Sequence, residues 1–136
     1  MPALILDSSV TLSLAFEDEC DDFTRRVFEA VKQAGALVPS LWRLEVANIM
    51  VSSVKRKRLT GPDAGLFLSL LSTQPIQVAD DNNLSAAALY ELALRYGLTA
   101  YDAAYLNLAE ITGLPLASKD AALKAAVIKA GLKLFA

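Results

Sequence analysis

Residues 3–9 read Ala-Leu-Ile-Leu-Asp-Ser-Ser, and this stretch sets the interpretation of the whole chain. A short apolar run that ends on a carboxylate and two hydroxyls is typical of a buried strand that stops at a polar edge. After it the pattern becomes helical, with apolar residues at Val10, Leu12 and Leu14. In an open parallel sheet, ligands bind in the crevice outside the carboxyl ends of the strands. We therefore expect Asp7 to lie in such a crevice.

The length and the hydrophobicity of the chain indicate one globular domain. Its 136 residues suit a single domain spanning 1–136 with a core of its own. The hydrophobic share of 54% is high and indicates helices that are apolar on more than one face, or a subunit interface. No apolar run approaches the roughly 20 residues of a membrane span, and the first residues do not form a signal peptide. We expect a cytoplasmic protein.

The residue types that are missing exclude several kinds of chemistry. The chain has no histidine and one cysteine, Cys20. A Ser-His-Asp triad, a histidine base and the usual zinc sites are therefore excluded. The glycines form neither a P-loop nor a dinucleotide-binding fingerprint. A net charge of −2 argues against a general nucleic-acid coat but leaves room for a local basic face.

Strand-like and helix-like patterns alternate along the chain. Further strands are expected at residues 36–38, 76–78, 114–117 and, at an edge, 132–134. Helices are expected at residues 22–34, 40–58, from 61 onward, 80–96, 100–112 and 121–130. The helix at 100–112 is apolar nearly all round, which predicts a central position. This alternation predicts a three-layer α/β/α domain around a short, mostly parallel sheet.

Two details of these helices are also predicted. Ser40 is the expected N-cap of its helix. In the helix that begins at residue 61, the inward side chains are expected to be Leu66, Phe67, Leu70 and Leu71.

Four acidic residues stand where the expected sheet edge would gather them. Asp7 follows the first strand and Asp120 follows the fourth. Asp102 lies in the first turn of the central helix, and Glu45 interrupts an apolar helix. Each also has a structural explanation. Asp7, Asp102 and Asp120 could serve as helix caps, and Glu45 could lie on a solvated stripe.

The conjunction of the four carboxylates favours a metal site. Clustered carboxylates repel one another and need a proton or a cation to neutralise them. Hard oxygen ligands without nitrogen or sulfur suit Mg²⁺ or Mn²⁺. Such a site orients a phosphodiester, activates a water molecule and stabilises the leaving oxygen without a side-chain nucleophile.

Four motifs occur in the order seen in PIN-domain ribonucleases, and the chain resembles VapC-like toxins of type II toxin–antitoxin pairs. The motifs are Asp7-Ser8-Ser9-Val10, Pro39-x₅-Glu45-x-x-Asn48, Tyr101-Asp102-Ala103-x-Tyr105-Leu106-x-Leu108-Ala109 and Ser118-Lys119-Asp120. The resemblance covers essentially the whole chain, and the Tyr-Asp-Ala segment is its most specific part.

The resemblance implies a metal-dependent endoribonuclease. Asp7, Glu45, Asp102 and Asp120 would surround Mg²⁺ or Mn²⁺. Ser9, Asn48 and Ser118 match supporting positions of the motifs, where Ser118 replaces the Thr that is also common. Because alanines follow Asp120, a second metal site lacks an extra carboxylate. The resemblance also implies an RNA substrate, a homodimer and inhibition by a cognate antitoxin.

A basic stretch and two tyrosines leave alternatives open. Lys55, Arg56, Lys57 and Arg58 end the helix that carries Glu45. They could complement the helix dipole or contact RNA phosphates, and the two roles are compatible. Tyr101 and Tyr105 lie one helical turn apart, which favours core or dimer packing over base stacking.

Two rival functions remain. An aspartate-based phosphatase would use Asp7 and Lys119, but Ser9 occupies the position of its second Asp, and Glu45 and Asp102 would have no role. A catalytically silent partner-binding scaffold of the same fold is the more serious rival, although the presence of all four acids argues for an intact site.

Overall fold

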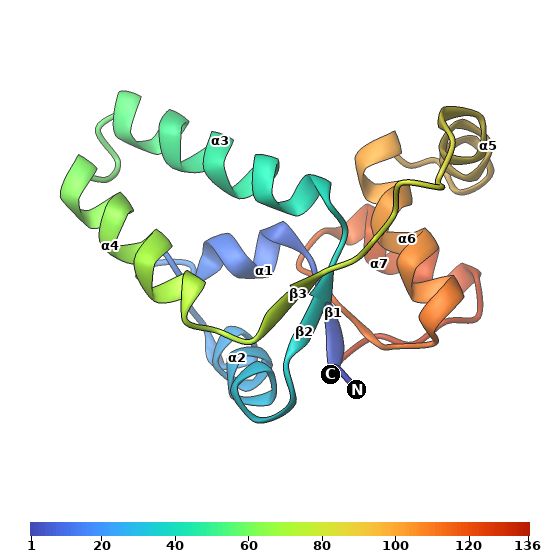
Figure 1. Cartoon of the computed structure of the whole chain (residues 1–136), viewed down its shortest axis with the longest axis horizontal. Coiled ribbons are helices and arrows are strands. Elements are labelled where there is room, and N and C mark those ends of the chain that lie inside the picture. The colour runs from blue at the N-terminus through green and yellow to red at the C-terminus, as the bar shows by residue number, and fades with distance from the viewer.

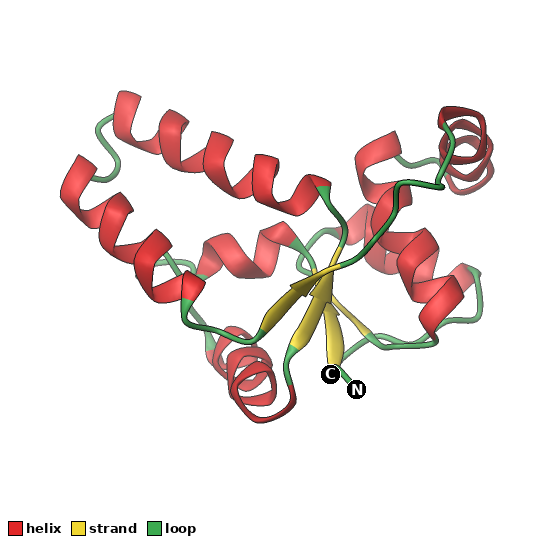
Figure 2. Cartoon of the chain, in the orientation of Figure 1, coloured by secondary structure: helices red, strands yellow, loops and turns green.

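The computed structural model describes residues 1–136 as one four-stranded sheet between two layers of helices (Figures 1 and 2). The strands are β1 (Leu4–Leu6), β2 (Ala36–Val38), β3 (Ile76–Val78) and β4 (Leu116–Ala117). Their order is β3-β2-β1-β4, and every pairing is parallel. The predicted three-layer class is confirmed.

Seven helices cover the sheet. They are α1 (Ser8–Ser13), α2 (Asp22–Ala34), α3 (Leu41–Lys55), α4 (Gly61–Ser72), α5 (Ala86–Tyr96), α6 (Ala100–Thr112) and α7 (Ala121–Lys129). Figure 1 shows α1 to α4 on one side of the sheet and α5 to α7 on the other. No helix combines the length and the apolar character that a membrane span would require.

The strand order places a switch point between β1 and β4. The chain moves outward from β1 through β2 to β3, then returns to the opposite side of β1 as β4. The crevice beyond the carboxyl ends at such a reversal is the usual ligand site of an open α/β sheet. Asp7 follows β1 directly, and Ser118 follows β4 directly. Two polar residues that are far apart in sequence therefore meet there.

The core is built from the strands and from the sheet-facing side of α6. All three residues of β1 and of β2 are buried. Six residues of α6 are also buried, which agrees with its predicted central position: Ala103, Ala104, Tyr105, Leu106, Leu108 and Ala109.

The inward face of α4 differs from the prediction. Leu66 and Leu70 are 60% and 58% exposed, whereas Ala64 and Leu71 are buried. Ala64 packs with Phe16 and Met50 in a small separate cluster, which turns α4 so that its other leucines face outward. An almost wholly apolar helix carries no polar face from which its orientation could be predicted.

Two helix boundaries, one helix cap and the last strand also differ from the prediction. Helix α3 ends at Lys55, and Lys57 adopts a φ of 60°, so residues 56–58 form a turn. Helix α5 begins at Ala86 because Ser85, not the earlier acids, accepts a hydrogen bond from the Ala88 amide. Ser40 occupies the predicted N-cap position of α3, but its side chain makes no capping hydrogen bond. The final edge strand is reduced to one bridge, between Leu116 and Leu134.

Gly35 is the position where α2 must end for β2 to enter the sheet. Its φ is +83°, and a Cβ there would lie 2.9 Å from the Pro75 carbonyl oxygen. That oxygen already accepts a hydrogen bond from the Ala36 amide at 3.0 Å. The backbone between α2 and β2 therefore lies so close to Pro75, the residue before β3, that only glycine fits at position 35 without strain.

Gly35→Ala is expected to lower the free energy of unfolding by about 1–3 kcal/mol, because alanine adopts this backbone conformation only under strain. Urea denaturation measures the loss. Gly61→Ala is the matched control, since nothing lies within 4 Å of its Cβ position. It should change the free energy of unfolding by less than about 1 kcal/mol. Equal losses in the two variants would contradict the packing described for Gly35.

Candidate active site

Asp7 forms the floor of the site at the end of β1. It occupies the N-cap position of α1, yet its carboxylate accepts no capping hydrogen bond from that helix. Instead, the Ser9 and Ser118 hydroxyls each donate to Oδ2 at 2.7 Å. The Ser8 hydroxyl lies 3.4 Å from Oδ1. The capping explanation for Asp7 is therefore wrong for its side chain.

Burial and hydrogen bonding act in opposite directions on Asp7. Its residue is only 3% exposed, and this desolvation raises the pKa of the carboxyl. The bonds from Ser118 and Ser9 lower the pKa in part, and the nearby charge of Asp120 raises it again. The hydroxyl donors hold the Asp7 carboxylate in place, but no cationic side chain pairs with it, so its negative charge is not neutralised.

The two serines also join the loops that follow β1 and β4. Ser9 Oγ accepts from the Lys119 amide at 3.0 Å, and Ser118 Oγ accepts from the Asp120 amide at 2.9 Å. Each hydroxyl thus donates to Asp7 while it accepts from the backbone next to Asp120. This network fixes the position of Asp120 relative to Asp7. The predicted supporting positions of Ser9 and Ser118 correspond to these contacts.

Glu45 reaches the site from the second turn of α3. Its Oε1 accepts a hydrogen bond from the Tyr105 hydroxyl at 2.6 Å. Burial raises the pKa of Glu45, the Tyr105 hydroxyl lowers it in part, and the charge of Asp7 raises it. Glu45 is half-buried and held by a core residue, so it does not lie on a fully solvated stripe.

Tyr105 is a supporting residue that sequence analysis assigned to packing alone. Its side chain is fully buried, which confirms core packing, but its hydroxyl is also directed at an acid of the site. Burial and the contact with Glu45 raise the pKa of Tyr105 far above its usual value, so the hydroxyl remains a donor. Tyr105 lies three residues after Asp102, so the two share one face of α6, and this spacing could have indicated that Tyr105 also faces the site.

Asp102 and Asp120 complete the acidic set. The Thr99 hydroxyl caps α6 by accepting from the Asp102 amide at 3.1 Å, which leaves the Asp102 carboxyl free of capping. Burial, contact with Asp120 and the charges of Asp7 and Glu45 together raise the pKa of Asp102 to about 7. Asp120 does cap its helix, because Oδ1 accepts from the Ala122 amide at 3.0 Å. The capping role of Asp120 is compatible with a place in the site.

All four acids line one cavity of about 570 Å³. It also includes Asn48, whose exposed side chain forms no hydrogen bond, and Tyr101, which is 65% exposed. The remaining lining residues are Ser8, Ser9, Leu12, Leu44 and Ile49. Residues from α1, α3, α6 and the turn before α7 therefore converge on one crevice at the switch point.

The donor set fits a hard, partly hydrated cation. Every candidate ligand is an oxygen, as Mg²⁺ and Mn²⁺ prefer. No three His, Cys, Asp or Glu side chains are close enough to enclose an ion by themselves. Mg²⁺ usually keeps several waters and uses only one or two carboxylates, so a full protein cage is not required. Burial and the neighbouring carboxylates raise the pKa of Asp102, and a bound cation would favour its charged form.

The basic stretch lies away from this cavity. Lys55 is ten residues beyond Glu45 on α3, roughly 15 Å along the helix axis. Lys55, Arg56 and Lys57 are exposed and make no ion pair. Arg58 pairs with Asp18 and Glu19 and stacks 3.6 Å from the centre of the Phe16 ring. None of the four lines the acidic cavity.

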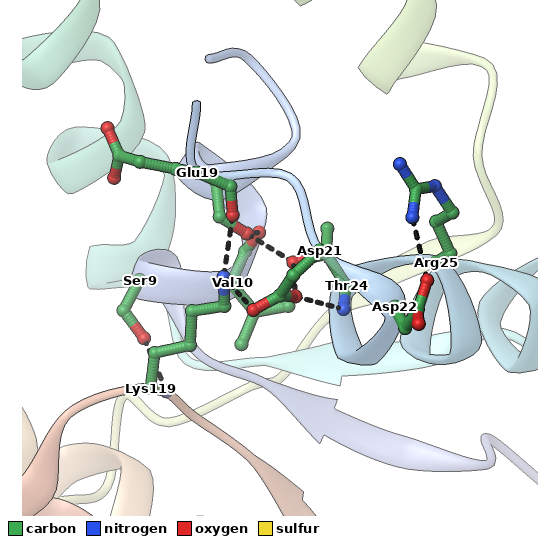
Figure 3. Close-up of polar contacts among 9 residues, drawn as sticks. Ser9, Val10, Glu19, Asp21, Asp22, Thr24, Arg25 and Lys119 are labelled. Carbon is green, nitrogen blue, oxygen red and sulfur yellow. Dashed lines mark hydrogen bonds and ion pairs between the residues drawn. The ribbon is translucent and has the colours of Figure 1, made fainter. Parts of the chain in front are cut away.

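Lys119 has a structural role that the sequence did not reveal. Figure 3 shows its ammonium between the Glu19 carbonyl oxygen, at 2.7 Å, and the Asp21 carboxylate, at 3.1 Å. Asp21 in turn caps α2 by accepting from the Thr24 amide. Because these bonds hold the pKa of Asp21 far below its usual value, the pair stays ionised. Lys119 thus ties the loop after β4 to the start of α2.

Comparisons with known proteins agree with this arrangement. A family model described as PIN domain matches residues 4–129. The crystal structure of PAE2754 from Pyrobaculum aerophilum superposes with a TM-score of 0.68 and 25% sequence identity. The match covers 90% of this chain and 84% of that protein. No curated protein matches the sequence of this chain.

The raised pKa of Asp102 predicts a specific pH dependence of stability. Unfolded Asp102 loses its proton near its ordinary pKa of 3.8, whereas folded Asp102 retains it up to about pH 7. The native state therefore binds more protons between these values, and this residue makes stability fall as pH rises through them. Asp102→Asn removes that loss.

The measurement is the urea midpoint in EDTA at pH 5 and at pH 8. Asp102→Asn should gain stability relative to wild type, and more so at pH 8 than at pH 5. Glu110→Gln, an exposed acid on the same helix, should show no such growing advantage. If the difference in stability between Asp102→Asn and wild type is the same at both pH values, the pKa of the Asp102 carboxyl is not raised.

Proposed function

The chain belongs to the PIN domain family, and we propose that it is an Mg²⁺- or Mn²⁺-dependent endoribonuclease that cleaves RNA phosphodiesters. PIN domains are typically nucleases, and as a group they use divalent metals. The observation that carries the proposal is the convergence of four carboxylates on one cavity at the β1/β4 switch point.

The roles follow from the contacts of each residue. Asp7, held by Ser9 and Ser118, is the most rigidly positioned ligand candidate. Asp102 and Asp120 would share the cation with it, and Glu45 would face the same space from α3. When bound, the metal would orient the phosphodiester, activate a water molecule and stabilise the leaving oxygen.

The protein side chains supply positioning and proton binding. Tyr105 keeps Glu45 directed into the cavity through its short hydrogen bond. Asp102 releases its proton near neutral pH, and this proton must leave before the carboxylate can act as a ligand. Asn48, at the open rim, is placed to donate to a substrate phosphate.

We further propose that the protein is the toxin of a toxin–antitoxin pair, forms a homodimer and acts in the cytoplasm. The single cysteine is unpaired, which suits a reducing compartment. Exposed apolar side chains occur on two pairs of helices, α3–α4 and α5–α6, and Figure 1 shows these helix pairs on either side of the sheet. On α3 and α4 they are Leu44, Val51, Leu66 and Leu70, and on α5 and α6 they are Tyr90, Leu94, Tyr101 and Ile111. Exposed apolar side chains in this number suit contacts with a second copy and with an antitoxin.

Cleavage of a mixed RNA pool tests the proposed activity. The full chain, shown to be folded and free of bound antitoxin, is incubated with RNA in Mg²⁺, in Mn²⁺ and in EDTA. Asp102→Asn keeps the shape of the side chain but removes a charged ligand. It should lower the cleavage rate by at least about 100-fold, since the loss of a supporting residue alone costs about 10- to 100-fold.

Glu110→Gln is the matched control for loss of one carboxylate from α6, and it should cleave as wild type does. Cleavage that persists in EDTA or in Asp102→Asn would contradict the carboxylate mechanism. The absence of metal-dependent cleavage of any RNA would favour the partner-binding scaffold.

Tyr105→Phe tests the support that Tyr105 gives to Glu45. It retains the buried ring but removes the hydroxyl that donates to Oε1. We expect metal-dependent cleavage to fall by about 10- to 100-fold, as for other residues that orient metal ligands. Far-UV circular dichroism should be unchanged. An activity within twofold of wild type would show that Glu45 needs no such support.

A further inference from the structure

A second cavity, also of about 570 Å³, shares the loop after β4 with the acidic cavity. Ser118 and Lys119 line this second cavity, and Asp120, the next residue, lines the acidic one. Its other walls come from the first turns of α2, from α7 and from the residues after α7. They comprise Asp21, Phe23, Arg26, Lys124, Leu134, Phe135 and Ala136.

The charge of this cavity is opposite to that of its neighbour. Three cationic side chains line it, against one acidic side chain. Asp21 is already paired with Lys119 at 3.1 Å. Arg26 and Lys124 are exposed and form no salt bridge. Two cations therefore remain free to contact an anion from outside.

Lys124 lies one helical turn after Asp120 and lines the second cavity. Its amide donates to the Asp120 carbonyl oxygen at 3.0 Å, so the two residues lie one helical turn apart on α7. Arg26 approaches from α2, where its guanidinium lies 5.8 Å from the centre of the Phe23 ring. The Lys119–Asp21 pair in Figure 3 joins these two elements and holds the walls of the cavity together.

Two half-buried aromatic rings form the apolar part of the cavity. Phe23 and Phe135 have ring centres 6.5 Å apart and are tilted by 56°. Aromatic rings next to arginine and lysine side chains are the usual surface for single-stranded RNA, where bases stack on rings and cations contact phosphates. Both rings also pack against the main core, which holds them in place at the cavity wall.

We propose that this cavity binds the single-stranded RNA segment next to the bond that is cut, an inference that rests on the proposed ribonuclease function. Arg26 and Lys124 contact backbone phosphates, and the Phe23–Phe135 pair contacts a base. The strand passes over the Ser118-Lys119-Asp120 loop, from the basic cavity into the acidic one. Because phosphate contacts carry no sequence information, this segment adds affinity more than selectivity.

RNA binding without cleavage isolates this contribution. A fluorescent single-stranded RNA oligonucleotide is titrated with the full chain in EDTA, and anisotropy gives Kd over a range of salt concentrations. Arg26→Gln and Lys124→Gln should each raise Kd about fivefold at 0.1 M salt and lower the slope of log Kd against log salt by about 0.7. Phe135→Leu should raise Kd without changing that slope.

Arg25→Gln is the matched control, because Arg25 neighbours Arg26 on α2 but pairs with Asp22 and does not line the cavity. It should leave Kd within twofold of wild type. Equal effects of Arg25→Gln and Arg26→Gln would indicate a diffuse charge effect and overturn the inference.

The outcomes also separate this inference from the proposed function. If wild type cleaves RNA and the Arg26 and Lys124 variants bind as wild type does, the cavity is not an RNA site while the nuclease stands. If those variants bind RNA more weakly but no metal-dependent cleavage occurs in wild type, the RNA-binding role of the cavity is supported and the proposed ribonuclease function is overturned. If a glutamate-rich peptide, rather than RNA, binds in an Arg26-dependent way, the cavity serves an acidic protein segment and the RNA inference is overturned.

Discussion

The structure depends on one buried carboxylate that two parallel strand ends share. Asp7 leaves β1, Ser118 leaves β4, and the 2.7 Å hydrogen bond between their side chains joins chain segments 111 residues apart. The register of β1 with β4 pairs Leu6 with Ala117, which brings the next residue of each strand to the same level. Ser9 adds a second donor from α1. A lone buried carboxylate is costly, and here hydroxyl donors reduce that cost without removing the charge.

The same arrangement concentrates negative charge where the fold offers no cation. Lys119 follows Ser118 directly, yet its ammonium is directed to Asp21 and the Glu19 carbonyl instead of to the acids. Arg58 is likewise paired with acids near the start of α2. Burial and the neighbouring carboxylates therefore raise the pKa of Asp7, Glu45 and Asp102, most clearly at Asp102. Such a site gives up some stability in the metal-free protein and gains a preformed set of oxygen ligands for a cation.

Much of this arrangement was predictable because residues close together in the sequence determine it. The apolar run before Asp7, the Thr99 cap of α6 and the glycine after α2 each specify a boundary within a few residues. The alternation of strands and helices then specifies the parallel sheet, and the parallel sheet places the carboxyl ends of its strands together. Sequence position singled out all four acids but left each with a capping or solvent-facing explanation, and the family motifs then favoured one shared site.

The rest depended on packing that short sequence patterns do not specify. Leu66 and Leu70 face outward because Ala64 meets Phe16 and Met50, and the nearly uniform apolar sequence of α4 gave no sign of that choice. Tyr105 and Lys119 make their contacts across 60 and 100 residues of chain, to Glu45 and to the Glu19 carbonyl. The second, basic cavity is formed by α2, α7 and the residues after α7, so no continuous motif marks it.

The central claim is that the acids at the β1/β4 switch point form a site for a hard divalent cation. The most direct measurement is anomalous diffraction from crystals of the full chain grown with Mn²⁺. We predict a manganese peak inside the cavity lined by Asp7, Glu45, Asp102 and Asp120, with oxygen ligands and bound waters. A cavity without manganese, in crystals near pH 8 and with no lattice contact covering it, would contradict the account.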